Sequence, residues 1–490
     1  MNRFLKILLS VALVAGTLVG TPALAADRTP PAAGVESIGT IAGDQVVVDR
    51  DKIIAAALAH NEMLAASGAM KDAADADALG AWRGFLPQLQ LGEFFMRSDD
   101  ALSSFGFKLQ NRGVTPLDFG IAPTGFISEN INEPGETNNF ITRIQVLQPI
   151  FNGGMGFYGK QAANAASVAA GYKHARAAET IRFHAIQAYE GLTLATAYTR
   201  VMEAAVESAE GHVRQARSMV ENEMATEADL LQARVYLSTL QQKLIEVKNM
   251  ARVAGENIKL LTAVDTTLPL VSDPDDQGSD SEALAQQVSM PDFFDAAAVA
   301  ERSDILARRH EAEAAGKMVG VARGSMLPHL NLSVQKDWYD MEDPFGTNAD
   351  SWTLGVYATM GFGVQNIGEL KKAKAQSRAA RYMADFETRQ ARVQATEAWL
   401  NLQAAHEKVM VAREAVQAAR EGLRIVTNQY REGLATMVNL LDTQAYATQA
   451  EGNLVQALHD FRVGLASLEF NGALPGPGMT KTNNPTPAGQ

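Results

Sequence analysis

The chain contains no cysteine among its 490 residues. This absence excludes disulfide bonds, thiolate metal sites and a lipid-modified N-terminal cysteine, so stability must come from packing or assembly. After Ala25 there is also no uninterrupted apolar run that approaches the roughly 18 residues needed by a membrane-spanning helix. The formal net charge of −13 argues against nucleic acid as a partner.

The N-terminus has the pattern of a secretory signal peptide. Arg3 and Lys6 precede an apolar run from Ile7 to about Val19, and residues 23–25 offer a small-x-small cleavage site. We therefore expect residues 1–25 to be a signal peptide and residues 26–50 to be an N-terminal extension of the exported chain.

The remainder of the chain is an internal duplication. Asp229-Leu230-Leu231 corresponds to Asn439-Leu440-Leu441 at an offset of 210 residues, whereas Leu86-Pro87 corresponds to Leu327-Pro328 at an offset of 241. The difference of 31 indicates an insertion in the first half. We expect a first structural repeat at 51–262, an acidic linker or equatorial region at 263–290, a second repeat at 291–470 and a disordered tail at 471–490.

Each half predicts a helix, two strands, a long helix, a tight turn and a shorter helix. Apolar residues from Leu402 to Tyr430 keep an unbroken 4-3 heptad spacing, and the positions 210 residues earlier repeat it with one polar exception. Such a period is typical of a left-handed coiled coil. The long helices, expected at 156–219 and 368–429, are roughly 90–95 Å each. With shorter helices at 51–82 and 292–323, they predict a helical cylinder without a globular core.

The predicted strands alternate between apolar and polar residues. Leu330, Leu332 and Val334 alternate with polar neighbours, which predicts one apolar and one polar face. The pattern fits a half-buried soluble sheet as well as a membrane barrel. In lipid, four strands leave their edges unpaired. Eight strands from two copies make a filled barrel, so twelve strands from three copies are the smallest assembly with a lumen.

Two segments resemble TolC-like outer membrane efflux proteins. Leu147–Gly154 resembles the strand-to-helix corner of that family, and Gly433–Asp442 resembles its second periplasmic hairpin tip. The resemblance covers about residues 45 to 470. It implies a mainly α chain with transmembrane β-structure: a long coiled-coil α-helical barrel, plus four strands per chain that complete a 12-stranded barrel in a homotrimer. It also implies the outer membrane of a Gram-negative bacterium, with a large periplasmic portion.

The resemblance implies a passive duct with no enzymatic activity. Such a channel of a tripartite efflux or type I secretion system takes cargo from an inner-membrane transporter of the RND, ABC or MFS type through a periplasmic adaptor, or membrane fusion protein, to the exterior. The main alternative is a periplasmic adaptor-type coiled-coil protein, and a secreted filament is another. Two hairpins 210 residues apart disfavour an adaptor, since adaptors normally carry one hairpin flanked by β-rich domains.

The same resemblance suggests an aperture. In the family, acidic residues three apart ring the periplasmic opening, and here those positions are Asn439 and Asp442, with Asp229 and Gln232 equivalent in the first half. One carboxylate in place of two predicts weaker cation affinity, unless Asp229 supplies the missing charge.

The hairpin tips carry the candidates for adaptor docking. Gly433 permits a tight turn, whereas its counterpart Glu223 needs no such backbone angle, so we expect the two tips to differ in shape. The docking candidates are Val220, Ala225, Thr226, Tyr430, Gly433, Leu434 and Thr436.

Aromatic residues in or beside the strands suit contact with the surface of the outer-membrane lipid, with core packing as the alternative. They are Trp338, Tyr339, Trp352 and Tyr357. The eight histidines show no metal-ligand spacing. Gly154–Gly159 fits G-x-G-x-x-G, but the βαβ unit that dinucleotide binding requires is missing. We expect no catalytic residue, metal site or cofactor.

Overall fold

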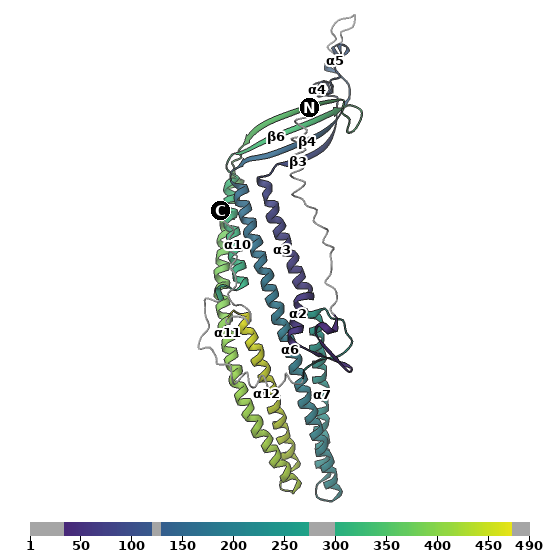
Figure 1. Ribbon diagram of the computed structural model, residues 1–490, viewed down its shortest axis with the longest axis vertical. Coiled ribbons are helices and arrows are strands. Elements are labelled where there is room, and N and C mark those ends of the chain that lie inside the picture. The colour runs from purple at the N-terminus through teal and green to yellow at the C-terminus, as the bar shows by residue number, and fades with distance from the viewer. Residues whose placement is uncertain (1–33, 120–128, 274–298, 473–490) are drawn as a thin grey trace. The chain divides into compact units, whose positions relative to one another are not determined.

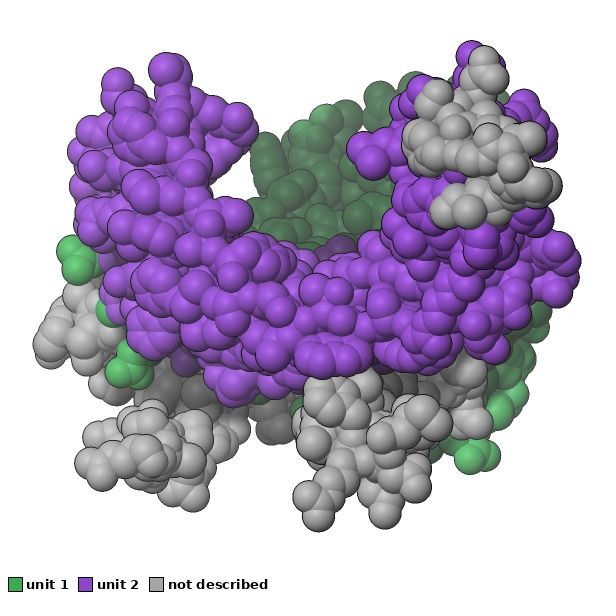
Figure 2. All heavy atoms as spheres, turned by 90° about the horizontal axis from the view of Figure 1, so that it is seen from above, with its two compact units in different colours: residues 1–68, 174–302, 391–490 green, residues 69–173, 303–390 purple. Residues whose placement is uncertain are grey.

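The computed structural model describes residues 34–119, 129–273 and 299–472. The chain divides into two compact units, coloured separately in Figure 2: unit 1 comprises residues 1–68, 174–302 and 391–490, and unit 2 comprises residues 69–173 and 303–390. Each unit takes segments from both halves of the sequence, so the units do not follow the repeats. The expected signal peptide, most of the acidic linker and nearly all of the tail lie outside the described residues.

Unit 2 contains an antiparallel four-stranded sheet in the order β3 (Gln88–Ser98), β4 (Thr137–Asn152), β6 (His329–Asp340) and β7 (Ala349–Thr359). The β4–β6 pair joins the two halves of the duplication, which leaves β3 and β7 as the edges. The β4–β6 register shifts between Pro149 and Phe151, where proline has no N–H to donate. In Figure 2 the atoms of unit 2 form a curved band that is open on one side.

Two very long helices carry the coiled-coil pattern (Figure 1). Helix α6 spans Met155–Glu221 and α11 spans Val364–Arg431, so their 67 and 68 residues correspond to about 100 Å each. Each is followed by a turn and a shorter helix, α7 (Glu227–Thr262) and α12 (Met437–Phe470). Each observed long helix begins and ends a few residues beyond the bounds predicted from the sequence.

The heptad positions of the second hairpin form its buried seam. Leu402, Ala405 and Val409 on α11 pack with residues of α12, including Ala457 and Phe461. A Cβ built on Gly464 meets Leu402 at 3.2 Å, so the absence of a side chain there permits close approach of the two helices. The heptad spacing therefore located a true packing face.

The segment expected to be one helix at 51–82 is divided at Asn61. Helix α2 (Arg50–His60) ends there, because Asn61 has an extended ψ of 123°. The Oδ1 atom of Asn61 accepts hydrogen bonds from the N–H groups of Met63 at 3.0 Å and Leu64 at 3.2 Å, which caps α3 (Glu62–Gly80). The expectation of a single helix was wrong because this asparagine begins a new helix. In the second half, α10 is Ser303–Gly324.

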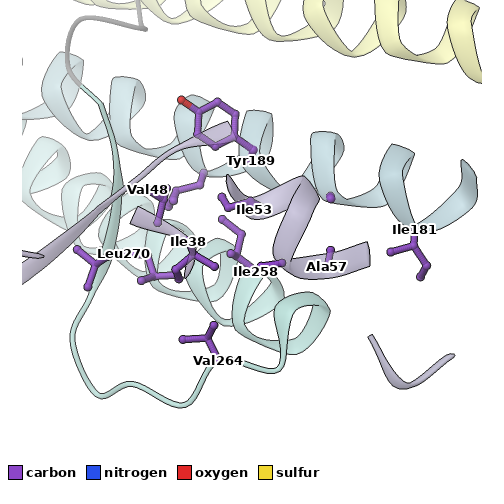
Figure 3. Packing of buried hydrophobic residues seen from close by; sticks show 13 residues of the cluster. Ile38, Val48, Ile53, Ala57, Ile181, Tyr189, Ile258, Val264 and Leu270 are labelled. Carbon is purple, nitrogen blue, oxygen red and sulfur yellow. The ribbon is translucent and has the colours of Figure 1, made fainter. Parts of the chain in front are cut away.

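The prediction that there is no globular core was also wrong. Strands β1 (Gly39–Ala42) and β2 (Gln45–Val48) are antiparallel, and β2 pairs in parallel with β5 (Leu270–Ser272). Figure 3 shows the cluster that this small sheet forms with α2, α6 and α7, in which Ile53, Tyr189 and Ile258 are buried. The N-terminal extension and the first residues of the linker thus complete a compact core in unit 1.

Among the described residues, no single helix has both the length and the apolar character needed to cross a membrane. One bent pair, 50–60 and 62–84, passes that test by length and composition when taken together, with a bend of 42°.

Candidate functional site

One face of the sheet in unit 2 is apolar and exposed. The register places Leu91, Ile144, Lys336 and Trp352 in one row across the four strands. On the edge strands, the exposed fractions reach 71% for Leu91 and 66% for Trp352. The same face carries the exposed side chains of Leu89, Phe95, Leu354 and Val356. A contiguous apolar face of this kind fits contact with lipid.

The opposite face is polar and internally hydrogen-bonded. The guanidinium of Arg143 donates to both carboxylate oxygens of Asp337, at 2.8 and 3.2 Å. The Arg143 guanidinium also lies 5.2 Å from the centre of the Phe94 ring. Beside this pair, Gln145 donates to Ser333 at 2.9 Å. Such a network suits a surface that faces water.

The four predicted interface aromatics are divided between the two faces. Trp338 and Trp352 lie on the apolar face, where Lys336 lies 5.6 Å from the Trp338 ring and pairs with Asp350. Tyr339 is buried on the polar face, and its hydroxyl lies 3.0 Å from the Ser351 hydroxyl. Tyr357 shares the polar face with Asn331. The period-2 alternation places the two tyrosines on the opposite face from the two tryptophans, and the membrane-interface position of the four residues stays a prediction.

The two hairpin tips in unit 1 have the same backbone geometry. Glu223 has a φ of 59° and Gly433 a φ of 71°. In each tip this residue and the next donate backbone hydrogen bonds to the last turn of the long helix, at 3.0 and 2.8 Å in the first tip and at 3.1 and 2.8 Å in the second. These bonds are typical of a Schellman helix end, which requires a left-handed residue whatever its side chain. The expectation that the tips differ in shape was therefore wrong.

Threonine begins the helix that follows each tip. The hydroxyl of Thr226 accepts from the N–H of Asp229 at 3.3 Å, and the Asp229 carboxylate accepts from the N–H and hydroxyl of Thr226 at 3.0 and 2.8 Å. This is a capping box. Thr436 caps α12 by accepting from the N–H of Asn439 at 3.2 Å. Asp229 therefore has a structural role besides its proposed place at the aperture.

The docking candidates differ in exposure. Leu434 is 75% exposed, and Thr226, Gly433 and Thr436 are also exposed. Tyr430 is only 3% exposed, because it is packed in a cluster shared by all four helix ends. Val220 and Ala225 are half-buried. The expectation of a docking role for Tyr430 was wrong for the folded chain, since its side chain lies between the hairpins.

Two tyrosines face the acidic residues of the neighbouring hairpin. Burial, and secondarily the charge of Asp442 on α12, raise the pKa of Tyr236 on α7 to about 12. Burial and then the charge of Asp229 raise the pKa of Tyr430 on α11. The sequence reasoning missed Tyr236, although it lies three residues after the buried Ala233 on α7.

A second missed feature is a buried polar cluster between α6 and α12. Ser208 donates to the Oε1 atom of Gln444 at 2.8 Å, and the Nε2 atom of His212 lies 3.4 Å from the same oxygen. His212 and Gln444 are 6% and 5% exposed. Burial lowers the pKa of His212, the Gln444 bond opposes that effect, and the charge of Arg431 adds to it. The histidine therefore favours its neutral form.

Asp442, Asn439 and Gln232 are exposed, whereas Asp229 is half-buried. Within the described residues, no group of three or more histidine, aspartate or glutamate side chains is arranged to hold a metal ion.

Comparison with known proteins gives three kinds of match. The sequence model of a family described as "Outer membrane efflux protein" matches residues 53–264 and 296–470. The outer membrane efflux protein BepC of Brucella suis biovar 1 (strain 1330) is 28% identical over 251 residues, which are 51% of this chain and 53% of that relative. The chain thus matches about half the length of this curated relative.

Solved structures show the same fold at low identity. CusC is 16% identical with a TM-score of 0.72, covering 92% of this chain and 99% of that one. VceC of Vibrio cholerae is 19% identical with a TM-score of 0.68, covering 86% and 96%. The CmeC outer membrane channel of Campylobacter jejuni is 17% identical with a TM-score of 0.70, covering 89% and 90%.

Proposed function

The chain belongs to the outer membrane efflux protein family, and on this premise we propose that it is the outer-membrane channel of a tripartite efflux or type I secretion system. Three copies form a passive duct that carries substrates to the exterior. The observation that supports this most is the sheet of unit 2, which is apolar and exposed on one face, polar on the other, and open at both edges.

The open edges are the reason for proposing three copies. Strands β3 and β7 have 11 residues each, and each is hydrogen-bonded to a neighbouring strand on one side only within the described chain. In lipid, unpaired backbone groups cost several kcal/mol each. Pairing β7 of one copy with β3 of the next satisfies both edges, and three copies give twelve strands around a polar lumen.

The partners that we propose are a periplasmic adaptor and an inner-membrane transporter of the RND, ABC or MFS type. The adaptor docks on exposed residues of the hairpin tips, of which Leu434 is the most apolar and exposed. Thr226, Thr436 and Gly433 support this surface through helix capping and turn closure.

The aperture that we propose is formed by the exposed side chains of Asp442, Asn439 and Gln232, with Asp229 nearby in the first tip. Three-fold symmetry turns Asp442 into a ring of three carboxylates, which attracts cations. Asn439 adds hydrogen-bonding groups but no charge, so this mouth binds divalent cations more weakly than one with two acidic rings.

Conductance in planar bilayers tests both the channel and the aperture. We expect the purified protein to form cation-selective pores that divalent cations block from the side of the hairpin tips. Asp442→Ala should weaken this block roughly tenfold, since three charges are removed together, and Asn439→Asp should strengthen it.

Glu432→Ala is the matched control, because it removes a charge from an exposed residue of the same tip that lies outside the proposed aperture. Absence of any pore from the folded protein would overturn the channel assignment and favour the adaptor. Pores whose divalent block is the same with Asp442→Ala would remove this residue from the aperture and leave the channel assignment intact.

A further inference from the structure

The insertion in the first half has a fold of its own. Between β3 and β4 the chain forms α4 (Ala101–Gln110), η3 (Pro116–Phe119) and α5 (Glu129–Asn132), whereas residues 341–348 join β6 to β7. Asp100 caps α4 by accepting from the N–H of Ser103 at 2.9 Å. Both connections leave the strands at the end of the sheet opposite the helices α6 and α11.

Helix α4 is attached to the polar face of the sheet. Ser104 is fully buried, and its hydroxyl donates to the carbonyls of Ser98 at 2.8 Å and Gly135 at 3.3 Å. Directly after α4, Asn111 donates to the side chain of Asn139 at 2.8 Å. Asn139 is fully buried on the polar face of β4 and donates back to Gln110 at 3.0 Å.

The burial of the sheet changes along this face. Ile141, Tyr339 and Ala349 form a cross-strand row, and they are 5%, 7% and 2% exposed. Farther from the loop end of β7, on the same face, Thr353 is exposed and Tyr357 is 41% exposed. The polar face is therefore buried at its loop end, where α4 packs against β4, and on β7 it becomes exposed farther from that end.

An ion pair within the insertion and a hydrogen bond to β7 fix the position of this segment. Lys108 on α4 pairs with Asp118 of η3 at 2.8 Å, and with the Thr115 N–H this bond lowers the pKa of Asp118 to about 2. Arg112 donates to the backbone carbonyl of Asp350 at the start of β7, at 3.2 Å. The inserted segment is thus bound to both edge strands, β3 and β7, and it does not extend freely from the sheet.

We propose that α4 is an inward-folded restriction that sets the size limit for solutes at the outer end of the lumen. This inference rests on the proposed function, because the polar face becomes a lumen only in a closed barrel. Twelve strands about 4.8 Å apart with a tilt near 40° give a barrel about 24 Å across its backbone. Three helices of about 10 Å diameter each occupy most of that opening.

Thiol labelling tests the restriction, since the chain has no cysteine of its own. Thr353→Cys places one thiol on the exposed polar face beyond the covered row. On intact cells we expect a small methanethiosulfonate to label it, and a maleimide on a long polyethylene glycol to be excluded. Replacing Ala101–Gln110 by a Gly/Ser segment of equal length should admit the large reagent, with labelling roughly tenfold faster.

Because the protein with the Gly/Ser segment could fail to fold, a milder pair of point substitutions provides a second test. Ser104→Ala with Asn111→Ala removes three of the anchoring hydrogen bonds and leaves the helix sequence otherwise intact. Asn331→Ala, on the polar face away from α4, is the matched control. In a detergent-purified Ala349→Cys protein, the thiol should resist the small reagent, and the double variant should expose it roughly tenfold more.

The outcomes separate the two proposals. Equal labelling of Thr353→Cys by the large reagent with and without α4, or an Ala349→Cys thiol that reacts freely in the unaltered background, would overturn the restriction while leaving the channel intact. Failure of even the small reagent to reach Thr353→Cys in folded protein would overturn the lumen itself, and with it the proposed function.

Discussion

At the scale of single residues, the hairpin tips show how backbone geometry can override residue type. Both tips close with the same hydrogen bonds, yet the left-handed position holds Gly433 in one and Glu223 in the other. A residue with a Cβ in this conformation costs roughly 1–2 kcal/mol relative to its preferred regions. The first tip therefore carries strain that the second tip avoids.

This strain predicts the effect of Glu223→Gly. We expect the substitution to stabilise the protein by about 0.5–1 kcal/mol, since relief of strain exceeds the added entropy of glycine in the unfolded chain. Gly433→Ala should cost about 1–2 kcal/mol for the converse reason. Urea unfolding in detergent measures both.

Glu207→Gly is a suitable control, because Glu207 is an exposed residue in the interior of α6 and glycine there should destabilise by about 1 kcal/mol. A Glu223→Gly protein that is less stable than the unaltered protein would contradict the strain argument.

Some residue-scale features were readable from the sequence and others were not. The capping box at Thr226 and Asp229 is a local pattern whose residue spacing is visible in the sequence, although we did not predict it. The left-handed Glu223 was not predictable, because its φ is set by hydrogen bonds to the preceding helix. The burial of Tyr430 depends on the packing of a second hairpin, which no local pattern contains.

At the scale of elements, periodic patterns predicted most of the helices and the alternating strands. Three features were not predicted: the break between α2 and α3 at Asn61, the small sheet of β1, β2 and β5, and helix α4. Strand β2 pairs with β5 through residues 46–48 and 270–272, which are more than 200 positions apart in the sequence. Such pairing leaves no periodic signal, because each strand has only three or four residues.

The contact between α6 and α12 predicts a dependence of stability on pH. His212 is buried, and its folded-state pKa lies below the value of about 6.5 that an exposed histidine has. The unfolded chain therefore binds more protons just below that pH. The contribution of His212 to the free energy of unfolding is fully present above about pH 6.5 and is lost as the pH falls toward the folded-state pKa. The loss is about 1.4 kcal/mol for each unit by which folding lowers this pKa.

His212→Gln should flatten this slope between about pH 6.5 and 5, since glutamine does not titrate. Thermal unfolding across this range measures the slope, and His406→Gln is a control on α11. An unchanged slope in the His212→Gln protein would show that other groups cause the acid sensitivity.

At the scale of the whole molecule, the comparisons confirm the family, the outer-membrane localisation and the fold of long helices with a β-sheet. The assignment from the sequence rested on the resemblance of Leu147–Gly154 and Gly433–Asp442 to this family, with which the internal repeat and the signal-peptide pattern agree. The proposed aperture, the docking surface and the domain boundaries remain predictions.

We propose that the four strands of the described sheet are too few to close a barrel, so that each chain shares its sheet edges with identical copies. The most direct test is the mass of the particle extracted from outer membranes in mild detergent, measured by light scattering with correction for bound detergent. We expect three chains in each particle. A monomer that stays dispersed in water without detergent would contradict it.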